Sequence, residues 1–383
     1  MIPYSKQFID DKDIDSVVKV LKSPLITQGS HVPKFENKVA KRCGSKYSFA
    51  VNSATSALHL ACLALELKKG DIIWTVPNTF VASANCGLYC GAKVDFVDIN
   101  IKTYNICIES LSQKLEHAEK KNKLPKILIP VHFAGQPTKQ DEIWKLSKRY
   151  KFKIIEDASH SLGAKYKNEK VGSCKWSDIT IFSFHPVKMI TTGEGGMLLT
   201  NDKRVASKVE MLRNSGITRN NKLFKVKNRE AWYYEQQLLG FNYRMTDIQA
   251  ALGLSQMNKL NKFLSKRNKI AKKYNNLLSS LPIRIPEVEK KAKSSFHLYV
   301  VRLADYSSKS YKKIFNYLRK NGVGVNLHYL PVHLHPYYRS LGFKEGDFPN
   351  AEKYSSEALS IPIHYELSDN EQEKIVSKIL AIL

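Results

Sequence analysis

Between residues 50 and 200, short apolar runs alternate with segments of helical periodicity and with turn residues. This alternation is typical of an α/β domain, because consecutive parallel strands need a crossover, usually a helix, between them. We therefore predict a large, mostly parallel seven-stranded sheet. The candidate strands are residues 48–51, 72–76, 93–97, 126–131, 153–156, 179–182 and 196–200, and helices are expected at residues 54–67 and 80–89.

The pattern changes beyond about residue 262. A long basic helix is followed by an apolar strand pattern at residues 296–303, a helix at 310–321, a short strand at 324–326 and a closing helix at 368–383. We predict a large domain at residues 1–262, with an N-terminal arm at 1–30, and a smaller α+β C-terminal domain at 263–383. A chain of 383 residues with 43% hydrophobic content is long enough to bury both cores.

The sequence contains no run of about 18 apolar residues, and its first residues lead into an acidic stretch rather than a hydrophobic signal core. We expect a cytoplasmic protein that does not enter a membrane. The six cysteines are scattered without paired spacing, although Cys86 and Cys90 lie four apart and could suggest a metal pair. Reduced thiols, with no disulfide and no structural metal, are the expectation for a cytoplasmic chain.

The chain is strongly basic, with 61 Lys and Arg against 35 Asp and Glu and a formal net charge of +26. Such a charge raises the hypothesis of a nucleic-acid or acidic-membrane partner. The lysines, however, are spread along the sequence in small groups instead of forming one basic arm. We therefore predict no nucleic-acid partner and a surface that favours an anionic small substrate.

Lys188 lies between two segments that suit a cofactor pocket, residues 182–187 and the glycine-rich residues 189–196. A lysine among Phe, Pro and Val is poorly solvated, which lowers its pKa toward the free amine that attacks a carbonyl. Such an amine can form a Schiff base. The alternative is a surface lysine whose stem packs against apolar neighbours.

Asp157 follows the predicted strand at residues 153–156, so its carboxylate is expected at the carboxyl end of the sheet, where open α/β sheets bind ligands. A carboxylate there can keep a pyridine nitrogen protonated. His160, three residues later, can orient Asp157 or contact an oxygen of the cofactor. The alternative for Asp157 is a cap of the next helix.

Small and hydroxylated residues at 52–58 mark a strand-to-helix junction, where free amides at the helix start and the hydroxyls of Ser53, Thr55 and Ser56 can donate to an anion. Ser183 can donate to a phosphate, and Phe80 can stack on a flat ring. The alternatives are an ordinary helix cap, a strand serine and a core phenylalanine. A lysine, a carboxylate and a phosphate cradle together predict pyridoxal 5'-phosphate as cofactor.

Three segments carry a resemblance to a known family: residues 156–160, residues 182–196 and residues 240–251. In this order and spacing the chain resembles, along essentially its whole length, the DegT/DnrJ/StrS family of sugar-nucleotide aminotransferases. The resemblance implies the aspartate-aminotransferase-like fold, fold type I of the pyridoxal phosphate enzymes. It also implies a homodimer whose active sites lie at the interface.

The resemblance further implies a role for each matching residue. Lys188 would be the Schiff-base lysine and the general acid and base, Asp157 the partner of the pyridinium nitrogen, and Phe80 the stacking ring. The remaining cofactor contacts would be Ala54, Thr55, Ser183, His160, which replaces the Gln of many members, and Asn242 from the partner protomer.

Within the family, residues 326–338 and 193–196 look most like the aminotransferases of pseudaminic acid biosynthesis. This similarity implies transfer of an amino group from L-glutamate to C4 of a UDP-linked 4-keto-6-deoxy-N-acetylhexosamine. His328, Tyr329, His333 and Tyr338 are the expected substrate-binding residues. Ordinary packing of a loop rich in Tyr and His is the alternative for each of them.

Three other functions compete with this interpretation. A sibling aminotransferase of a bacillosamine-type, perosamine or aminoarabinose pathway would keep every cofactor residue, because fold and cofactor do not fix the substrate. A dehydrase relative would carry histidine in place of Lys188. A non-enzymatic regulator would have a degenerate pocket, which the complete set of Lys188, Asp157 and phosphate contacts argues against.

Overall fold

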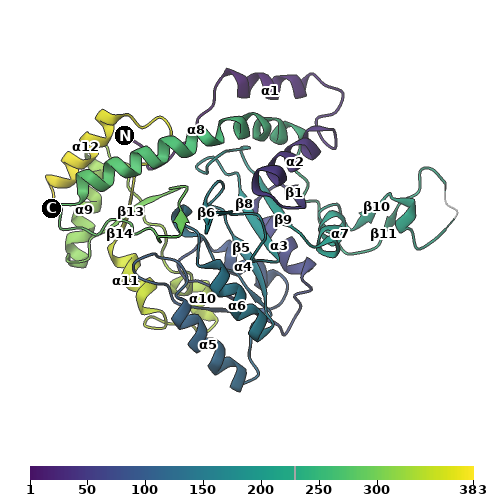
Figure 1. Ribbon diagram of the computed structural model, residues 1–383, viewed down its shortest axis with the longest axis horizontal. Coiled ribbons are helices and arrows are strands. Elements are labelled where there is room, and N and C mark those ends of the chain that lie inside the picture. The colour runs from purple at the N-terminus through teal and green to yellow at the C-terminus, as the bar shows by residue number, and fades with distance from the viewer. Residues whose placement is uncertain (228–229) are drawn as a thin grey trace.

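The computed structural model describes residues 1–227 and 230–383, and its centre is a seven-stranded sheet with the strand order β1-β9-β8-β5-β4-β2-β3 (Figure 1). Its strands are β1 (Tyr47–Val51), β2 (Ile72–Thr75), β3 (Lys93–Phe96), β4 (Ile127–Leu128), β5 (Lys153–Asp157), β8 (Ile179–Ser183) and β9 (Gly196–Thr200). All seven predicted strands are present, and six of them differ from the prediction by at most one residue at an end. The strand predicted at 126–131 is shorter than expected, because β4 has only two residues.

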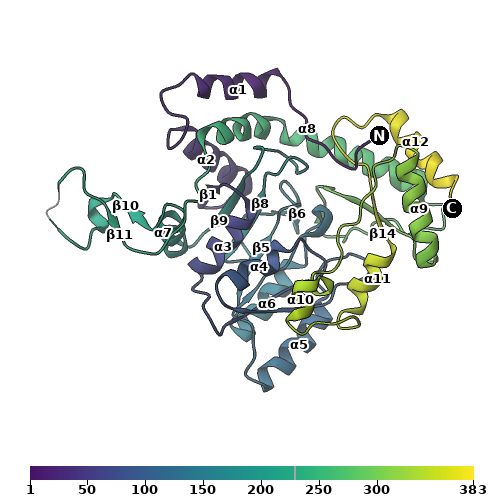
Figure 2. The same ribbon diagram turned by 180° about the vertical axis from the view of Figure 1, so that it is seen from behind.

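The sheet is mostly parallel, as predicted. Strands β3, β2, β4, β5 and β8 pair in parallel, whereas β9 is antiparallel to both of its neighbours, β8 and β1. Parallel neighbours end at the same edge of a sheet, so the residues that follow β2, β5 and β8 gather there. Figure 2 shows the same sheet from behind.

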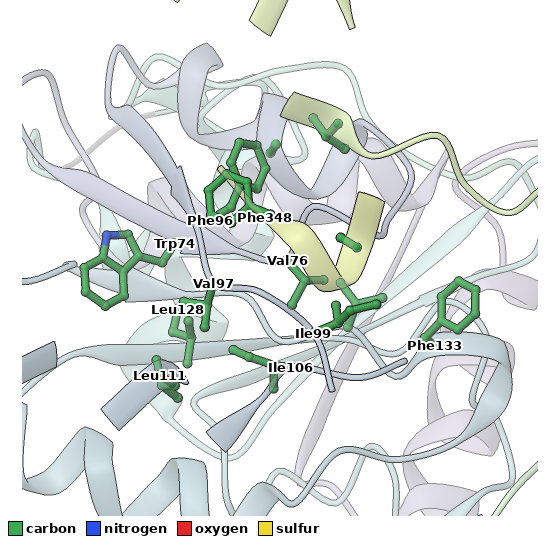
Figure 3. Close-up of a cluster of buried hydrophobic side chains, with 14 of the residues drawn as sticks. Trp74, Val76, Phe96, Val97, Ile99, Ile106, Leu111, Leu128, Phe133 and Phe348 are labelled. Carbon is green, nitrogen blue, oxygen red and sulfur yellow. The ribbon is translucent and has the colours of Figure 1, made fainter. Parts of the chain in front are cut away.

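Helices cover both faces of the sheet, which explains why β5, β8 and β9 are buried along nearly their whole length. On one face lie α3 (Ala54–Ala64), α4 (Ala82–Tyr89) and α7 (Lys203–Leu212), and on the other lie α2 (His31–Cys43), α5 (Ile108–Lys120) and α6 (Gln140–Tyr150). Figure 3 shows part of the hydrophobic core on the face covered by α5 and α6, including Trp74, Phe96, Leu111, Leu128, Phe133 and Phe348.

The C-terminal part has its own core, built around the antiparallel pair β13 (Tyr299–Arg302) and β14 (Ala358–Ile361). Its helices are α9 (Ser308–Lys320), α10 (Pro336–Ser340), α11 (Pro349–Glu357) and α12 (Asp369–Leu380). The expected strand at 324–326 is reduced to one bridge between Asn326 and Ser360. The helices expected at 310–321 and 368–383 correspond to α9 and α12.

Helix α8 (Asp247–Leu278) runs along both parts of the molecule (Figure 1). Its N-terminal half packs in the core of the large sheet and its C-terminal half, from Ile270 onward, packs in the smaller core. The boundary expected at residue 262 therefore falls inside a continuous helix. The division into two domains remains a prediction, with α8 shared between them.

Helix α1 (Asp11–Leu21) lies along α8, and the pair β10 (Ile217–Thr218) and β11 (Glu235–Gln236) belongs to an arm that projects from the body (Figures 1 and 2). A small sheet joins β6 (Lys165–Tyr166), β7 (Glu169–Lys170) and β12 (Ala292–Lys293). Short 3-10 turns occupy Phe133–Gly135, Asn221–Leu223 and Val332–Leu334. Within the described residues, no helix is long and apolar enough to cross a membrane.

Candidate active site

Lys188 lies in the loop that joins β8 to the reversed strand β9. Its backbone amide donates to the carbonyl of His185 across 2.9 Å, and Phe184 is tied to the returning chain by a bond to the Gly195 carbonyl. Burial lowers the pKa of Lys188 to about 8, although the neighbouring Asp157 carboxylate opposes this shift. The amine is therefore partly free of its proton near neutral pH, which a nucleophile requires.

Asp157 is the last residue of β5 and is buried. Ser83 of α4 donates its hydroxyl proton to Oδ2 across 2.6 Å, and the Ser159 amide donates to Oδ1 across 3.1 Å. Both donors hold the carboxylate group in one orientation. The Asp157 side chain is thus fixed at the carboxyl edge of the sheet, close to Lys188.

His160 is buried beside this carboxylate, and its two ring nitrogens have distinct partners. The Ala134 amide donates to Nδ1 across 3.2 Å, while Nε2 lies 3.3 Å from the Tyr329 hydroxyl. Burial, with Lys188 and His328 nearby, lowers the pKa of His160 well below its usual value. A neutral ring that accepts at Nδ1 carries its proton on Nε2, so His160 is a hydrogen-bond donor on the side of Tyr329.

The start of α3 forms an anion cradle. Ser53 caps this helix by accepting from the Ser56 amide, which leaves the first-turn amides of Ala54 and Thr55 without helical partners. Gly196 lies against this turn so closely that a Cβ there would come within 2.6 Å of the Ala54 nitrogen. Positive helix ends of this kind bind phosphate groups.

Ser183 lies on the same edge as the cradle. It ends β8 and is paired in register with Gly196, which in turn is paired with Val51 just before the α3 junction. Its half-buried hydroxyl accepts weakly from the His185 amide across 3.4 Å, so its proton is available to a ligand. The predicted phosphate contacts at Ala54, Thr55 and Ser183 are therefore neighbours in space.

Aromatic groups form the opposite side of the site. Phe80 is 58% exposed and precedes α4, which begins at Ala82 instead of at Phe80 itself. Its ring lies 6.4 Å from that of Tyr329, measured between centroids. His328 is buried, bonds to the Ser360 hydroxyl across 2.8 Å, and has a pKa lowered to about 4 by burial and by Lys188. Phe80, His328 and Tyr329 thus meet near Lys188 and Asp157.

His333 and Tyr338, the other two expected substrate contacts, are placed in the core and not at this site. His333 is fully buried against Phe348, with Nε2 2.9 Å from Glu352. Tyr338 is 2% exposed and donates to Asn85 across 2.6 Å. The prediction is corrected for both residues, because apolar neighbours enclose these side chains and hold their polar atoms away from any substrate.

Asn242 is exposed at the base of the projecting arm, where it forms a bridge with Asn214. The neighbouring backbone connects it to the cradle, since the Asn52 amide donates to the Tyr243 carbonyl. These contacts of Asn242 and its neighbour are all within one chain. A contribution of Asn242 to the site of a second protomer remains a prediction.

The sequence analysis did not identify three residues that contact the site. Ser83 holds Asp157, the Asn78 side chain accepts from the Tyr329 amide across 3.2 Å, and the His297 ring packs at a tilt against His160 with ring centroids 4.3 Å apart. Ser83 had a detectable signal, because it lies one turn after Phe80 in an expected helix. His297 had none, since it lies in an apolar strand pattern 137 residues after His160 in the printed sequence.

Comparison with known proteins agrees with this geometry. The DegT/DnrJ/EryC1/StrS aminotransferase family matches residues 7–380. The chain is 38% identical over 389 residues to the UDP-4-amino-4,6-dideoxy-N-acetyl-beta-L-altrosamine transaminase of Campylobacter jejuni, covering 100% of this chain and 98% of that relative.

Solved structures extend the likeness to the fold. PseC of Helicobacter pylori, an aminotransferase involved in pseudaminic acid biosynthesis, superposes with a TM-score of 0.91 at 30% identity, covering 100% of this chain and 98% of the other. The PLP-form of the putative sugar aminotransferase Spr1654 of Streptococcus pneumoniae superposes with a TM-score of 0.90 at 28% identity, covering 100% and 98%. The expected fold type I is confirmed, and the chain belongs to the DegT/DnrJ/EryC1/StrS family of pyridoxal phosphate-dependent aminotransferases.

Proposed function

We propose that this chain transfers an amino group from L-glutamate to C4 of a UDP-linked 4-keto-6-deoxy-N-acetylhexosamine. The product is UDP-4-amino-4,6-dideoxy-N-acetyl-beta-L-altrosamine, on the route to pseudaminic acid. The observation that carries this proposal is the grouping of Lys188, Asp157 and His160 in a chain that is 38% identical, along its whole length, to a transaminase of that name. We place this reaction in the cytoplasm.

The residues of the site fit pyridoxal phosphate. The free amides of Ala54 and Thr55 and the Ser183 hydroxyl suit its phosphate, and the fixed charge of Asp157 suits its pyridine nitrogen. His160 offers an Nε2 proton to the ring oxygen, and the exposed Phe80 ring can cover one face. When bound, the cofactor supplies an aldehyde that carries the amino group and a ring that accepts electrons.

Lys188 is the group that moves the proton. With a pKa of about 8, its amine can accept a proton from the α-carbon of glutamate near neutral pH in the first half-reaction, and it can deliver a proton to C4 of the sugar in the second. The same amine anchors the cofactor between turnovers. One side chain therefore serves as covalent anchor and as proton carrier.

The sugar nucleotide is proposed to lie between Phe80, Tyr329 and His328. These residues offer an exposed ring, a hydroxyl bonded to His160 and a neutral imidazole near Lys188. The formal net charge of +26 favours an anionic diphosphate by long-range attraction.

The proposed assembly is a homodimer in which Asn242 reaches the phosphate of the partner's cofactor. The arm beside it exposes large apolar side chains, including Trp232 at 75% and Leu239 at 83%, which a second copy of the chain can cover. A complementation experiment tests this assignment. Lys188→Ala and Asn242→Ala chains, each impaired alone, regain turnover when mixed only if Asn242 serves the other chain's site.

The substrate is tested with purified protein, pyridoxal phosphate and glutamate against a panel of UDP- and GDP-linked 4-keto sugars, with products identified by mass and by NMR at C4. Amination of the UDP-linked L-sugar alone supports the proposal. Amination of a bacillosamine-type, perosamine or aminoarabinose precursor instead keeps the enzyme class and rejects the pathway. No amination of any sugar rejects the proposed function.

A further inference from the structure

A buried pair of side chains lies directly behind the site. His132 is fully buried, Glu156 is 4% exposed, and His132 Nε2 lies 2.6 Å from Glu156 Oε2. The Thr138 amide donates to His132 Nδ1 across 3.0 Å, so the neutral ring carries its proton on Nε2 and donates it to Glu156. Thr180 donates to the other carboxylate oxygen across 3.3 Å. Burial raises and the His132 hydrogen bond lowers the pKa of Glu156, with a net shift downward.

The backbone of this pair holds the residues of the site. Glu156 precedes Asp157 on β5, and the His132 amide donates to the Asp157 carbonyl across 3.0 Å. Ser161, next to His160, donates its hydroxyl proton to the His132 carbonyl across 3.1 Å. The loop that begins at His132 is therefore bonded to the segment that carries Asp157 and His160 through three groups of His132: the side chain, the backbone amide and the backbone carbonyl.

The same loop supplies a backbone donor to the His160 side chain. Ala134, two residues after His132, directs its amide at His160 Nδ1 from a left-handed conformation with φ of 55°. A left-handed alanine is held there by surrounding contacts, because the conformation is unfavourable for a residue with a Cβ. If the loop relaxed, the Ala134 amide would move away and either nitrogen of His160 could carry the proton.

We infer that His132 and Glu156 are positioning residues that fix the tautomer of His160, so that Nε2 is the donor that faces Tyr329 and the cofactor. This inference rests on the proposed function, because His160 is assigned there to the ring oxygen of pyridoxal phosphate. The pair acts through the Ala134 amide and touches neither cofactor nor substrate. Its hydrogen bonds make the loop a rigid part of the site.

The chain offers a matched control for a purely structural role. His333 and Glu352 form a second histidine–glutamate pair, 2.9 Å apart, with the His333 ring packed against Phe96 and Phe348. Glu156→Leu and Glu352→Leu each remove the acceptor of a fully buried imidazole. Both variants are expected to lower the melting temperature. Glu156→Gln keeps an acceptor oxygen for His132 and serves as the conservative variant.

The first measurement is the tautomer of His160 in the cofactor-free protein, from NMR of isotope-labelled histidine, assigned with His160→Gln. The wild type, Glu352→Leu and Glu156→Gln are expected to carry the proton on Nε2, whereas Glu156→Leu populates both tautomers. If Glu156→Leu is destabilised but keeps the Nε2 proton, or if Glu156→Gln fails to restore it, the inference is wrong.

The second measurement is the pH titration of the visible absorbance of the holoenzyme. In Glu156→Leu, where the His160 donor is displaced, the midpoint of this titration is expected to shift by about half a pH unit or more. In Glu352→Leu no shift is expected. An unshifted midpoint in Glu156→Leu overturns the inference. A wild-type protein that gains no absorbance with pyridoxal phosphate overturns the proposed function instead, and the tautomer comparison still tests the role of the pair.

Discussion

Ser83 donates its hydroxyl proton to Asp157 across 2.6 Å, so a side chain of α4 holds the carboxylate that ends β5. Without Ser83, Asp157 keeps only the Ser159 amide as a donor to its side chain. Hydrogen bonds to charged groups contribute about 1.5–3 kcal/mol, and we expect Ser83→Ala to lower kcat at least about tenfold. Asp157→Asn removes the charge itself and is expected to lower kcat about a thousandfold or more.

The control for Ser83 is Ser147→Ala on α6. Ser147 is also buried, but its hydroxyl bonds only to the Trp144 carbonyl of its own helix. Turnover of this variant is expected to match the wild type. Equal kcat in Ser83→Ala and Ser147→Ala would show that the Ser159 amide alone suffices to hold Asp157.

The lowered pKa of Lys188 makes the stability of the cofactor-free protein depend on pH. The pKa falls from 10.5 to about 8 on folding, so between these values the unfolded chain binds more protons than the folded chain. The free energy of unfolding therefore rises with pH across this window. Lys188→Met removes this contribution, and its stability advantage over the wild type, measured by urea unfolding, is expected to shrink from pH 8 to pH 10.

A constant difference between Lys188→Met and the wild type would mean that Lys188 has an ordinary pKa. The same substitution is expected to abolish amination by the holoenzyme, lowering kcat by a factor of about a thousand or more.

Tyr329 lies at the candidate site and Tyr338 lies in the neighbouring core, so their substitution by Phe is expected to have different effects. Tyr329→Phe removes the hydroxyl bonded to His160 and is expected to lower kcat/KM for the sugar nucleotide about tenfold, with little change in stability. Tyr338→Phe leaves Asn85 without its buried donor and is expected to cost about 1 kcal/mol of stability with unchanged kcat/KM. Turnover assays and urea unfolding of both variants give the comparison. A loss of turnover in Tyr338→Phe alone would restore the role that the structure denies it.

Cys90 is expected to be the most reactive thiol. The contact with Cys62 lowers its pKa to about 6, with burial opposing and His59 assisting, whereas burial raises the pKa of Cys43 and Cys174 to about 12. At pH 7 we expect iodoacetamide to label Cys90 about tenfold faster than Cys107, which is also half-buried but lacks the Cys62 contact. Mass spectrometry of peptides after brief labelling measures this order. Faster labelling of Cys107 would contradict it.

The central sheet could be predicted because most of its strands are short runs rich in apolar residues and are bounded by turn residues or helices. Strand order and the reversal of β9 have no such local signal, since they depend on pairing between segments that are distant in sequence. The projecting arm also escaped prediction, because β10 and β11 contain two residues each and are too short to show any periodicity.

At the candidate site, a motif could predict where Lys188 and Asp157 lie on the sheet, whereas their roles remain predictions. His333 and Tyr338 share a segment with His328 and Tyr329, but the chain turns between them and directs the later pair into the core. A sequence of alternating aromatic and polar residues does not show which of them faces the solvent. Ser83 and Ala134 act through single hydrogen bonds whose partners lie far away in the chain.

The reversal of β9 also sets the order in which the molecule can be assembled during synthesis. Strand β1 is the first strand of the large sheet to leave the ribosome, yet its only neighbour in that sheet is β9, about 150 residues later. Until Thr200 has emerged, β1 has no edge to pair with, and the helix start behind it cannot be held against Gly196. In a nascent chain, the helix start that is proposed to bind phosphate can therefore be completed only after Lys188 has been made.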